Sequence, residues 1–318
     1  MVFNQLSIKI AMLKRWISII SGKSSVSIPQ GIGKIYSKEC VQGYYNDLTG
    51  KLKYTTLFDK NGIPLCQIGN GKYAYFPIAI IQYGLASYDD WLLTNSNDSY
   101  RNFSNIANWL IEKQEPNGSW NCFGLINSSK YRESSMCQGE AASLLIRKFR
   151  ETNNIVFYDA SKKAIDYMLT PIEEGGTAFY NNQDLFLEEY PLVGESNTVL
   201  NGWIFSIFGL YDFKKVNNEK KYDDIYRKTI QTLAKTLPKY DLGYWSKYDL
   251  SGKIASPAYQ ALHVALLNVM FDITGDNIFL YYSEKWNNDL SSKHKKYKAI
   301  IKKVYQKIFE KTDMIIIK

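Results

Sequence analysis

Apolar residues recur at the spacing of an α-helix in eight separate stretches of the chain. These stretches are residues 77–93, 99–114, 134–150, 157–170, 196–213, 218–236, 257–273 and 276–289. The first member of each successive pair is apolar over most of its surface, which is typical of a buried helix. The second member is rich in Lys, Asn and Asp, which favours an exposed position. The pattern predicts a mainly α protein built from about four helical hairpins.

The four apolar helices recur at intervals of about 60 residues and begin alike. Each has a polar amide near its start, namely Gln82, Gln138, Asn201 and Gln260. Helical hairpins that repeat in this way predict an incomplete α/α toroid, in which the inner helices start at one rim and place these amides around its mouth. An α-solenoid used for binding is the alternative.

Three segments rich in Gly and aromatic residues interrupt the helices and predict short β-hairpin insertions. They cover residues 117–124, 173–183 and 240–253. The domain prediction is a basic N-terminal helix and β-rich arm over residues 1–72, an α/α toroid catalytic domain over 73–292, and a basic helical tail over 293–318. The arm is expected to pack on the toroid mouth.

The net charge of +8 comes from the two ends of the chain. Residues 1–35 carry +5 and residues 293–318 carry +7, which leaves −4 for the part between them. This distribution argues against nucleic acid as a partner. The basic ends are amphipathic and predict docking helices, with peripheral attachment to an anionic membrane surface as the alternative. A homodimer is a further option for the assembly.

The number and spacing of the cysteines and histidines limit the kinds of site that the chain can form. The four cysteines form no CxxC pair, which predicts reduced thiols and a cytoplasmic protein. No stretch has the length of a membrane-spanning helix, and the first residues lack the pattern of a secretory leader. Two histidines cannot build a three-histidine metal site, and no nucleotide-binding glycine loop is present. We therefore expect no cofactor and no catalytic metal.

The stretch from Trp109 to Trp120 resembles the QW motif of toroidal triterpene cyclases, a structural clasp between helix pairs. The Asp-rich acid motif of those cyclases is absent, because the Tyr-Asp-Asp runs at 88–90 and 222–224 lack its first aspartate. The clasp supports the toroid and the missing acid argues against cyclase activity. The adjacent Glu188 and Glu189 also suit a glycosidase, but nothing selects a partner carboxylate among Asp249, Glu140 and Asp89.

Four blocks resemble, in order, the D-glucuronyl C5-epimerase C-terminal domain family. Glu189-Tyr190-Pro191 leads into a Leu-Asn-Gly helix that ends in Gly-Leu-Tyr-Asp, as in that family. The remaining blocks are IQYGLASY, SSMCQGEAASLLIRKF and LPKYDLGYWSKYDL with PAYQALHVALL. Together they span about residues 44–290, with gaps. The resemblance implies a cofactor-free epimerase that converts D-glucuronate to L-iduronate residues in a polysaccharide of the heparosan type.

The resemblance implies a role for four residues in proton transfer. Epimerisation at C5 removes a proton α to a carboxylate and returns one from the opposite face, so it needs two acid/base groups. Tyr248 and Tyr259 match the family's loop and helix tyrosines, while Tyr190 with Glu189 would relay a proton or hold the ring. Ser251 and Gln260 depart from the animal members, which have Arg and His there.

The other candidates bind the sugar or neutralise its carboxylate. Asn201 matches the asparagine that lines the family's cleft, and the starts of the inner helices add Gln82, Tyr83 and Gln138. The candidates for neutralising the carboxylate are Lys247, Lys253, Arg132 and His263. Two other functions remain open at this stage, a polysaccharide lyase that starts with the same proton abstraction and a glycan-binding protein without turnover.

Overall fold

The chain is described by a computed structural model that covers residues 28–68, 72–124, 132–194 and 196–309. Its main elements are four helical hairpins in chain order. They are α3 (Pro77–Thr94) with α4 (Asn97–Lys113), α5 (Ser135–Thr152) with α6 (Ile155–Leu169), α7 (Leu200–Val216) with α8 (Lys220–Tyr240), and α9 (Pro257–Thr274) with α10 (Asn277–Ser291). All eight helices lie within a few residues of the predicted stretches.

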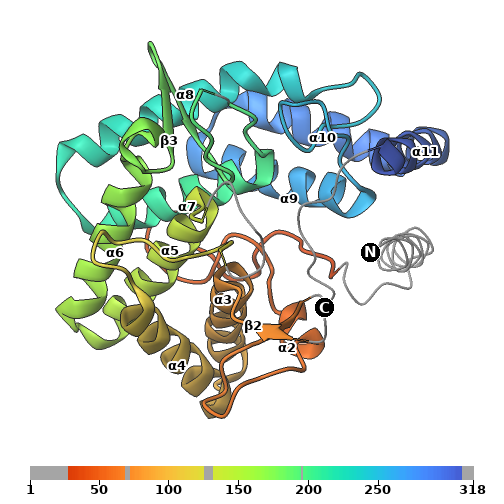
Figure 1. The fold of residues 1–318 in the computed structure, drawn as a ribbon. Coiled ribbons are helices and arrows are strands. Elements are labelled where there is room, and N and C mark those ends of the chain that lie inside the picture. Colours follow the sequence, from red (N-terminus) through yellow and green to blue (C-terminus); the bar gives the residue numbers. More distant parts are fainter. Residues whose placement is uncertain (1–27, 69–71, 125–131, 195, 310–318) are drawn as a thin grey trace, which may run out of the picture.

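The hairpins form an incomplete ring, which confirms the predicted α/α toroid. Helices α3, α5, α7 and α9 contact one another in chain order and line the inside, while α4, α6, α8 and α10 cover the outside (Figure 1). The inner helices are hydrophobic nearly all round; every residue of α7 from Leu200 to Phe213 is buried. The outer helices α4 and α8 bury one face only.

The repeat is visible in how each hairpin turns. Helices α3, α5 and α9 end on a residue in the left-handed conformation, with φ of 56° at Asn95, 52° at Asn153 and 71° at Gly275. The next residue caps the outer helix with its side chain, as at Asn154, which accepts from the Val156 N–H. Asn and Gly are the residues that tolerate this conformation at a helix end. These turns therefore set the antiparallel return of the outer helices.

Helices α5 and α7 approach closely because glycines face each other. A Cβ added at Gly209 would lie 2.2 Å from the carbonyl oxygen of Gly139, and one added at Gly139 would lie 2.6 Å from the Cα of Ser206. Neither position therefore accepts a larger residue without moving a backbone. The close contact brings the start of α5 against the middle of α7, where the Ser135 hydroxyl accepts from Ser206 at 2.9 Å.

Two of the three predicted hairpin segments contain pairing in the structure. Strands β3 (Ala178–Asn181) and β4 (Asp184–Leu187) form an antiparallel ladder around Asn182, whose φ is 53°. Residues 240–254 turn back through isolated bridges, including Lys247 with Ile254. The described part of 117–124 has no strand. There the predicted clasp is present instead, because the Gln114 amide donates to Ala160 of α6 at 2.9 Å.

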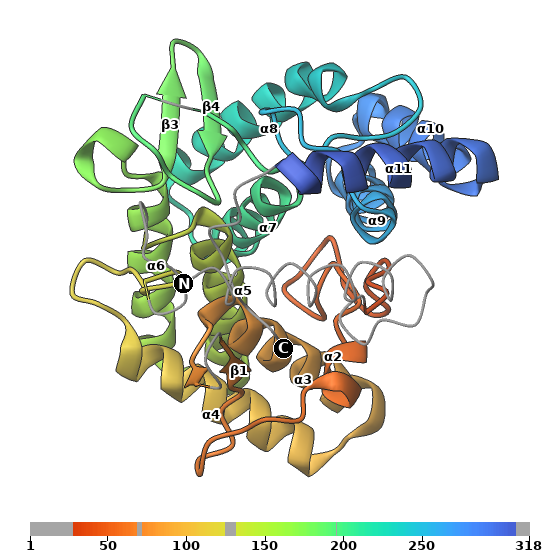
Figure 2. The same cartoon turned by 45° about the vertical axis from the view of Figure 1, so that its right-hand side comes forward.

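The N-terminal arm, residues 28–76, has little regular structure. It contains α2 (Gly50–Tyr54) and one ladder of two-residue strands, β1 (Cys66–Gln67) and β2 (Tyr73–Ala74). It runs between α3 and α9 (Figure 2). The Tyr36 hydroxyl bonds Asp272 near the end of α9 at 2.9 Å, so the arm also binds the rim opposite the mouth.

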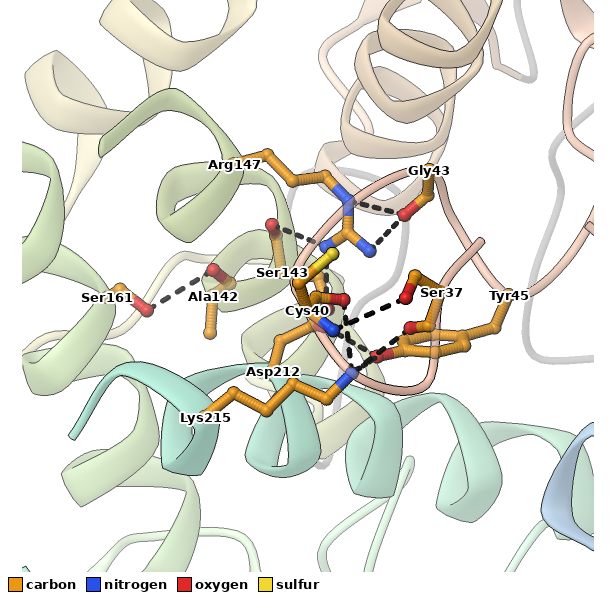
Figure 3. Close-up of polar contacts among 10 residues, drawn as sticks. All are labelled: Ser37, Cys40, Gly43, Tyr45, Ala142, Ser143, Arg147, Ser161, Asp212 and Lys215. Carbon is orange, nitrogen blue, oxygen red and sulfur yellow. Dashed lines mark hydrogen bonds and ion pairs between the residues drawn. The ribbon is translucent and has the colours of Figure 1, made fainter. Parts of the chain in front are cut away.

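A buried ion pair fixes the arm to the ends of two inner helices (Figure 3). Arg147 of α5 contacts the Asp212 carboxylate of α7 at 2.5 Å, and both side chains are buried. Asp212 also accepts from the Tyr45 hydroxyl at 2.6 Å and from the Ser143 hydroxyl at 2.7 Å. Arg147 donates from Nε to the Gly43 carbonyl at 2.8 Å. The arm thereby supplies partners for polar groups that the helices alone would leave buried and unpaired.

The C-terminal helix α11 (Lys293–Phe309) packs against the 240–254 segment. Its Gln306 accepts from the Ile254 N–H at 3.0 Å and donates to the Gly252 carbonyl at 3.1 Å. The predicted N-terminal helix lies outside the described residues. In the described part of the chain, no helix has the length and apolarity needed to cross a membrane. All four cysteines are free thiols, and the compartment stays a prediction.

Candidate active site

Tyr248 and Tyr259 lie against each other at the mouth of the toroid. Their ring centroids are 4.8 Å apart and the planes are inclined at 65°. The Tyr248 backbone is held by a bond from its N–H to the Lys253 carbonyl at 2.6 Å and by one to its carbonyl from Leu200 at 3.1 Å. Tyr259 is in the first turn of α9, where Ser256 caps its N–H. The structure therefore brings together two tyrosines from different elements, and their role as an opposed acid/base pair stays a prediction.

Tyr190 extends this pair into a row of four polar groups. Its hydroxyl is hydrogen-bonded with the Glu189 carboxyl and with the Tyr248 phenol. Phe123 packs on the Tyr190 ring at a centroid distance of 5.1 Å. The row thus runs from Glu189 through Tyr190 and Tyr248 to Tyr259, and a proton can move along its bonded part.

The electrostatics of the row keep the Tyr190 and Tyr248 phenols protonated at rest. Burial, and next the Glu189 carboxyl, raise the pKa of Tyr248 and of Tyr190 well above 10. Burial also raises the pKa of Glu189 to about 7, although the bond from Tyr190 works in the opposite direction. A carboxyl group that titrates near neutrality is suited to exchange protons with a neighbouring phenol.

The two adjacent glutamates face opposite ways, as the extended segment predicts. Glu188 accepts from Thr198 at 2.6 Å and from Ser196 at 2.8 Å, so its role is structural. Glu189 lies on the first turn of α7. A Cβ at Gly202 would lie 2.3 Å from the Glu189 carboxylate oxygen Oε2, so only glycine leaves room for this carboxyl. This contact explains the glycine of the Leu-Asn-Gly block.

The amides at the starts of the inner helices line the mouth beside the row. Gln82 donates to Glu140 Oε1 at 2.9 Å. Within the described part of the chain, several buried polar atoms near them have no hydrogen-bond partner. These are both amide atoms of Gln138, Glu140 Oε2, Glu189 Oε2 and Asn201 Oδ1. Buried polar groups are normally paired, so this concentration of unpaired atoms marks a place that a polar ligand can complete.

Four of the predicted substrate-binding residues have other surroundings. Tyr83 packs edge-on against Phe58, and its hydroxyl accepts from Asn102 at 3.3 Å. Arg132 pairs with Glu115 at 2.9 Å and Lys253 with Asp249 at 3.2 Å. Lys247 is held through its backbone N–H, which donates to Tyr240. Their binding of substrate stays a prediction.

His263 is buried between α9 and the 240–254 segment. Its Nδ1 lies 2.9 Å from the Ser246 hydroxyl, which donates to Gln260 Oε1 at 2.6 Å. Since that hydroxyl proton is used, Nδ1 carries the ring proton and donates to Ser246. Burial lowers the pKa of His263 to about 3, so the ring is neutral. The ring therefore carries no charge in the structure, and a role for His263 in binding the substrate stays a prediction.

Sequence reasoning missed the contributions of Glu140 and Lys51. Glu140 was considered only as the second carboxylate of a glycosidase, whereas the structure places it against Gln82 beside the mouth. Lys51 belongs to the short helix α2 of the arm. No motif marks it, because its position depends on how the arm crosses the ring.

Comparison with known proteins identifies the family. The family model for the D-glucuronyl C5-epimerase C-terminus matches residues 114–288, more than half of the chain. The chain belongs to this family. The match includes the whole Glu189, Tyr190, Tyr248 and Tyr259 row.

Two curated relatives match part of this chain. The D-glucuronyl C5-epimerase of Caenorhabditis elegans is 28% identical over 213 residues, which are 58% of this chain and 34% of that protein. An uncharacterised protein of Methanocaldococcus jannaschii is 30% identical over 171 residues, 52% of this chain and 54% of that protein. The chain thus spans between a third and about half of the length of these relatives.

A solved structure supports the fold. Cellobiose 2-epimerase from Spirochaeta thermophila superposes with a TM-score of 0.51 at 12% identity. The match covers 75% of this chain and 65% of that one. At this identity the likeness concerns the toroidal fold alone.

Proposed function

We propose that this member of the family is a C5-epimerase of hexuronate residues within a polysaccharide, of the D-glucuronate to L-iduronate type. The observation that carries the proposal is the pair Tyr248 and Tyr259, joined through Tyr190 to Glu189. Family membership supports epimerisation, and a polymer such as heparosan is the first substrate to test. The reaction needs no cofactor in this proposal. Among the described residues, no group of three or more His, Cys, Asp or Glu could hold a metal ion.

The mechanism follows from two tyrosines that approach one sugar from different elements. One tyrosine passes its phenol proton along the hydrogen-bonded row to the Glu189 carboxylate as it takes the C5 proton, and the electron pair moves into the substrate carboxylate to give an enolate-like intermediate. The other, as phenol, donates its proton to the opposite face of C5, which completes the inversion. The first tyrosine is then protonated and the second is not. The bond between Tyr190 and Tyr248 and the near-neutral pKa of Glu189 support a relay that restores the starting state.

Exchange in D2O tests the proposal. We expect deuterium at C5 when heparosan is incubated with the protein, and each of Tyr248→Phe and Tyr259→Phe should reduce inversion roughly 100-fold, the scale of lost acid–base catalysis. Tyr244→Phe is the matched control on the same segment, because Tyr244 instead faces Lys298 at 4.3 Å. No exchange on a panel of uronate polymers would refute epimerisation.

The same experiment separates the two other functions considered. A lyase would also exchange the C5 proton but would expel the C4 substituent, which creates a double bond that absorbs near-ultraviolet light. A glycan-binding protein would retain polymer without exchange or new absorbance. Full inversion with both Tyr→Phe variants would move the chemistry to Glu189 or another group.

A further inference from the structure

Lys51 of the arm carries a positive charge into the interior beside the mouth. Its side chain is half-buried, and its electrostatic partners are the Glu140 carboxyl and the Cys66 thiol. Within the described residues it has no salt bridge and no side-chain hydrogen bond. A lysine in such a position loses hydration without gaining a close acid, which is unfavourable unless a further anion is present.

The groups around Lys51 are equally incomplete. Glu140 uses one oxygen for Gln82 and leaves Oε2 without a partner in the described part of the chain. Burial raises the pKa of Glu140 to about 8, so at neutral pH its carboxyl is mostly protonated and does not cancel the lysine charge. A cation beside a buried carboxyl group with an unused oxygen is a receptor for a carboxylate.

Glu140 connects the lysine with the tyrosine row. It is within electrostatic reach both of Lys51 and of Glu189, the first member of the row. An anion held between Lys51 and Glu140 would therefore be on the Glu189 side of the row. The other cations considered for this purpose are less available, since Arg132 and Lys253 already pair with acids.

We propose that Lys51 binds the carboxylate of the uronate residue, with Glu140 as a hydrogen-bonding partner of that carboxylate. This inference rests on the proposed function and adds to it the source of charge neutralisation. The enolate-like intermediate carries more negative charge on the carboxylate than the substrate does, so a fixed ammonium group stabilises it preferentially. Lys51 lies outside the residues matched by the family model, so the arm contributes directly to the site of this chain.

Binding measurements test this assignment apart from turnover. The probes are a heparosan oligosaccharide and the same oligosaccharide with its carboxyl groups reduced to alcohols, titrated by calorimetry into the full chain. We expect Lys51→Met to weaken binding of the uronate form at least 10-fold and to leave binding of the reduced form unchanged. Lys53→Met is the matched control, because Lys53 lies on the same helix and is exposed. Lys51→Arg keeps the charge and should recover most of the affinity.

The outcomes separate this inference from the proposed function. Equal affinities of Lys51→Met and Lys53→Met for the uronate form would overturn it, as would a wild-type protein that binds both oligosaccharides equally. If Lys51→Met does not fold, the affinities of Lys51→Arg for the uronate form and of the wild-type protein for the two oligosaccharides still test the assignment. Lack of C5 exchange in the wild type refutes epimerisation only, whereas a carboxylate preference that depends on Lys51 supports this site in either case.

Discussion

Replacing Asp212 by alanine tests how the ring is held together. The Asp212 carboxylate accepts from Arg147 at 2.5 Å, from the Tyr45 hydroxyl at 2.6 Å and from the Ser143 hydroxyl at 2.7 Å. The change leaves the Arg147 guanidinium buried without its counter-charge. It also removes the partner of Tyr45, so it loosens the arm as well as the contact between α5 and α7.

The magnitude follows from the burial of the pair, whose side chains are 1% and 0% exposed. Breaking a buried ion pair by removing one partner costs about 3–5 kcal/mol of unfolding free energy. With an unfolding entropy of roughly 2 cal/mol/K per residue, a chain of this length should lose roughly 5–8 °C in Tm.

Thermal unfolding followed by circular dichroism measures the effect. Asp223→Ala is the control, because Asp223 forms a partly exposed pair with Lys214 on the outside of the ring and should cost at most about 1 kcal/mol. If Asp212→Ala melts no lower than Asp223→Ala, this network does not hold the arm on the ring.

Two further predictions concern carboxyl groups inside the molecule. Burial raises the pKa of Glu140 and of Asp89 to about 8, so between the unfolded and folded pKa values the folded state binds more protons than the unfolded state. The unfolding free energy should therefore fall as pH rises from about 4.5 to 8, and Tm measured across this range should show the fall. Glu140→Gln should flatten this pH dependence, and a profile unaltered by that change would contradict the explanation. Gly202→Ala places a methyl group against Glu189, so overpacking should lower the unfolding free energy by about 1–3 kcal/mol, and with it Tm, and should also slow C5 exchange. Gly31→Ala, whose Cβ would meet nothing within 4 Å, should change neither Tm nor exchange. Normal exchange in Gly202→Ala would show that the position of Glu189 is not critical.

The helical part of the fold could be predicted from the sequence because its cause is local. Burial of one helix of each pair on nearly all sides produces a continuous apolar pattern, and Asn or Gly followed by a capping residue marks the turn, as at Asn153 and Asn154. The tyrosine row could be predicted only through the family resemblance, since Tyr190 and Tyr248 are far apart in sequence.

The path of the arm and the site residues that depend on it could not be predicted. The arm has little regular structure, and its position is set by contacts between distant residues, such as Tyr36 with Asp272 and Arg147 with Gly43. No periodic signal records such contacts. Lys51 is for this reason indistinguishable in the sequence from the exposed Lys53 beside it.

The arm also changes how the repeats should unfold. Repeat proteins whose units contact only their neighbours can lose structure one unit at a time. Here one segment bonds α5 through Arg147, α7 through Asp212 and α9 through Asp272, so the release of any of these contacts weakens the attachment of the others. The ring should therefore melt as one cooperative unit. The partner of Tyr36 is Asp272 of α9, 236 residues later in the chain. The arm can therefore complete its docking only after the last hairpin has formed.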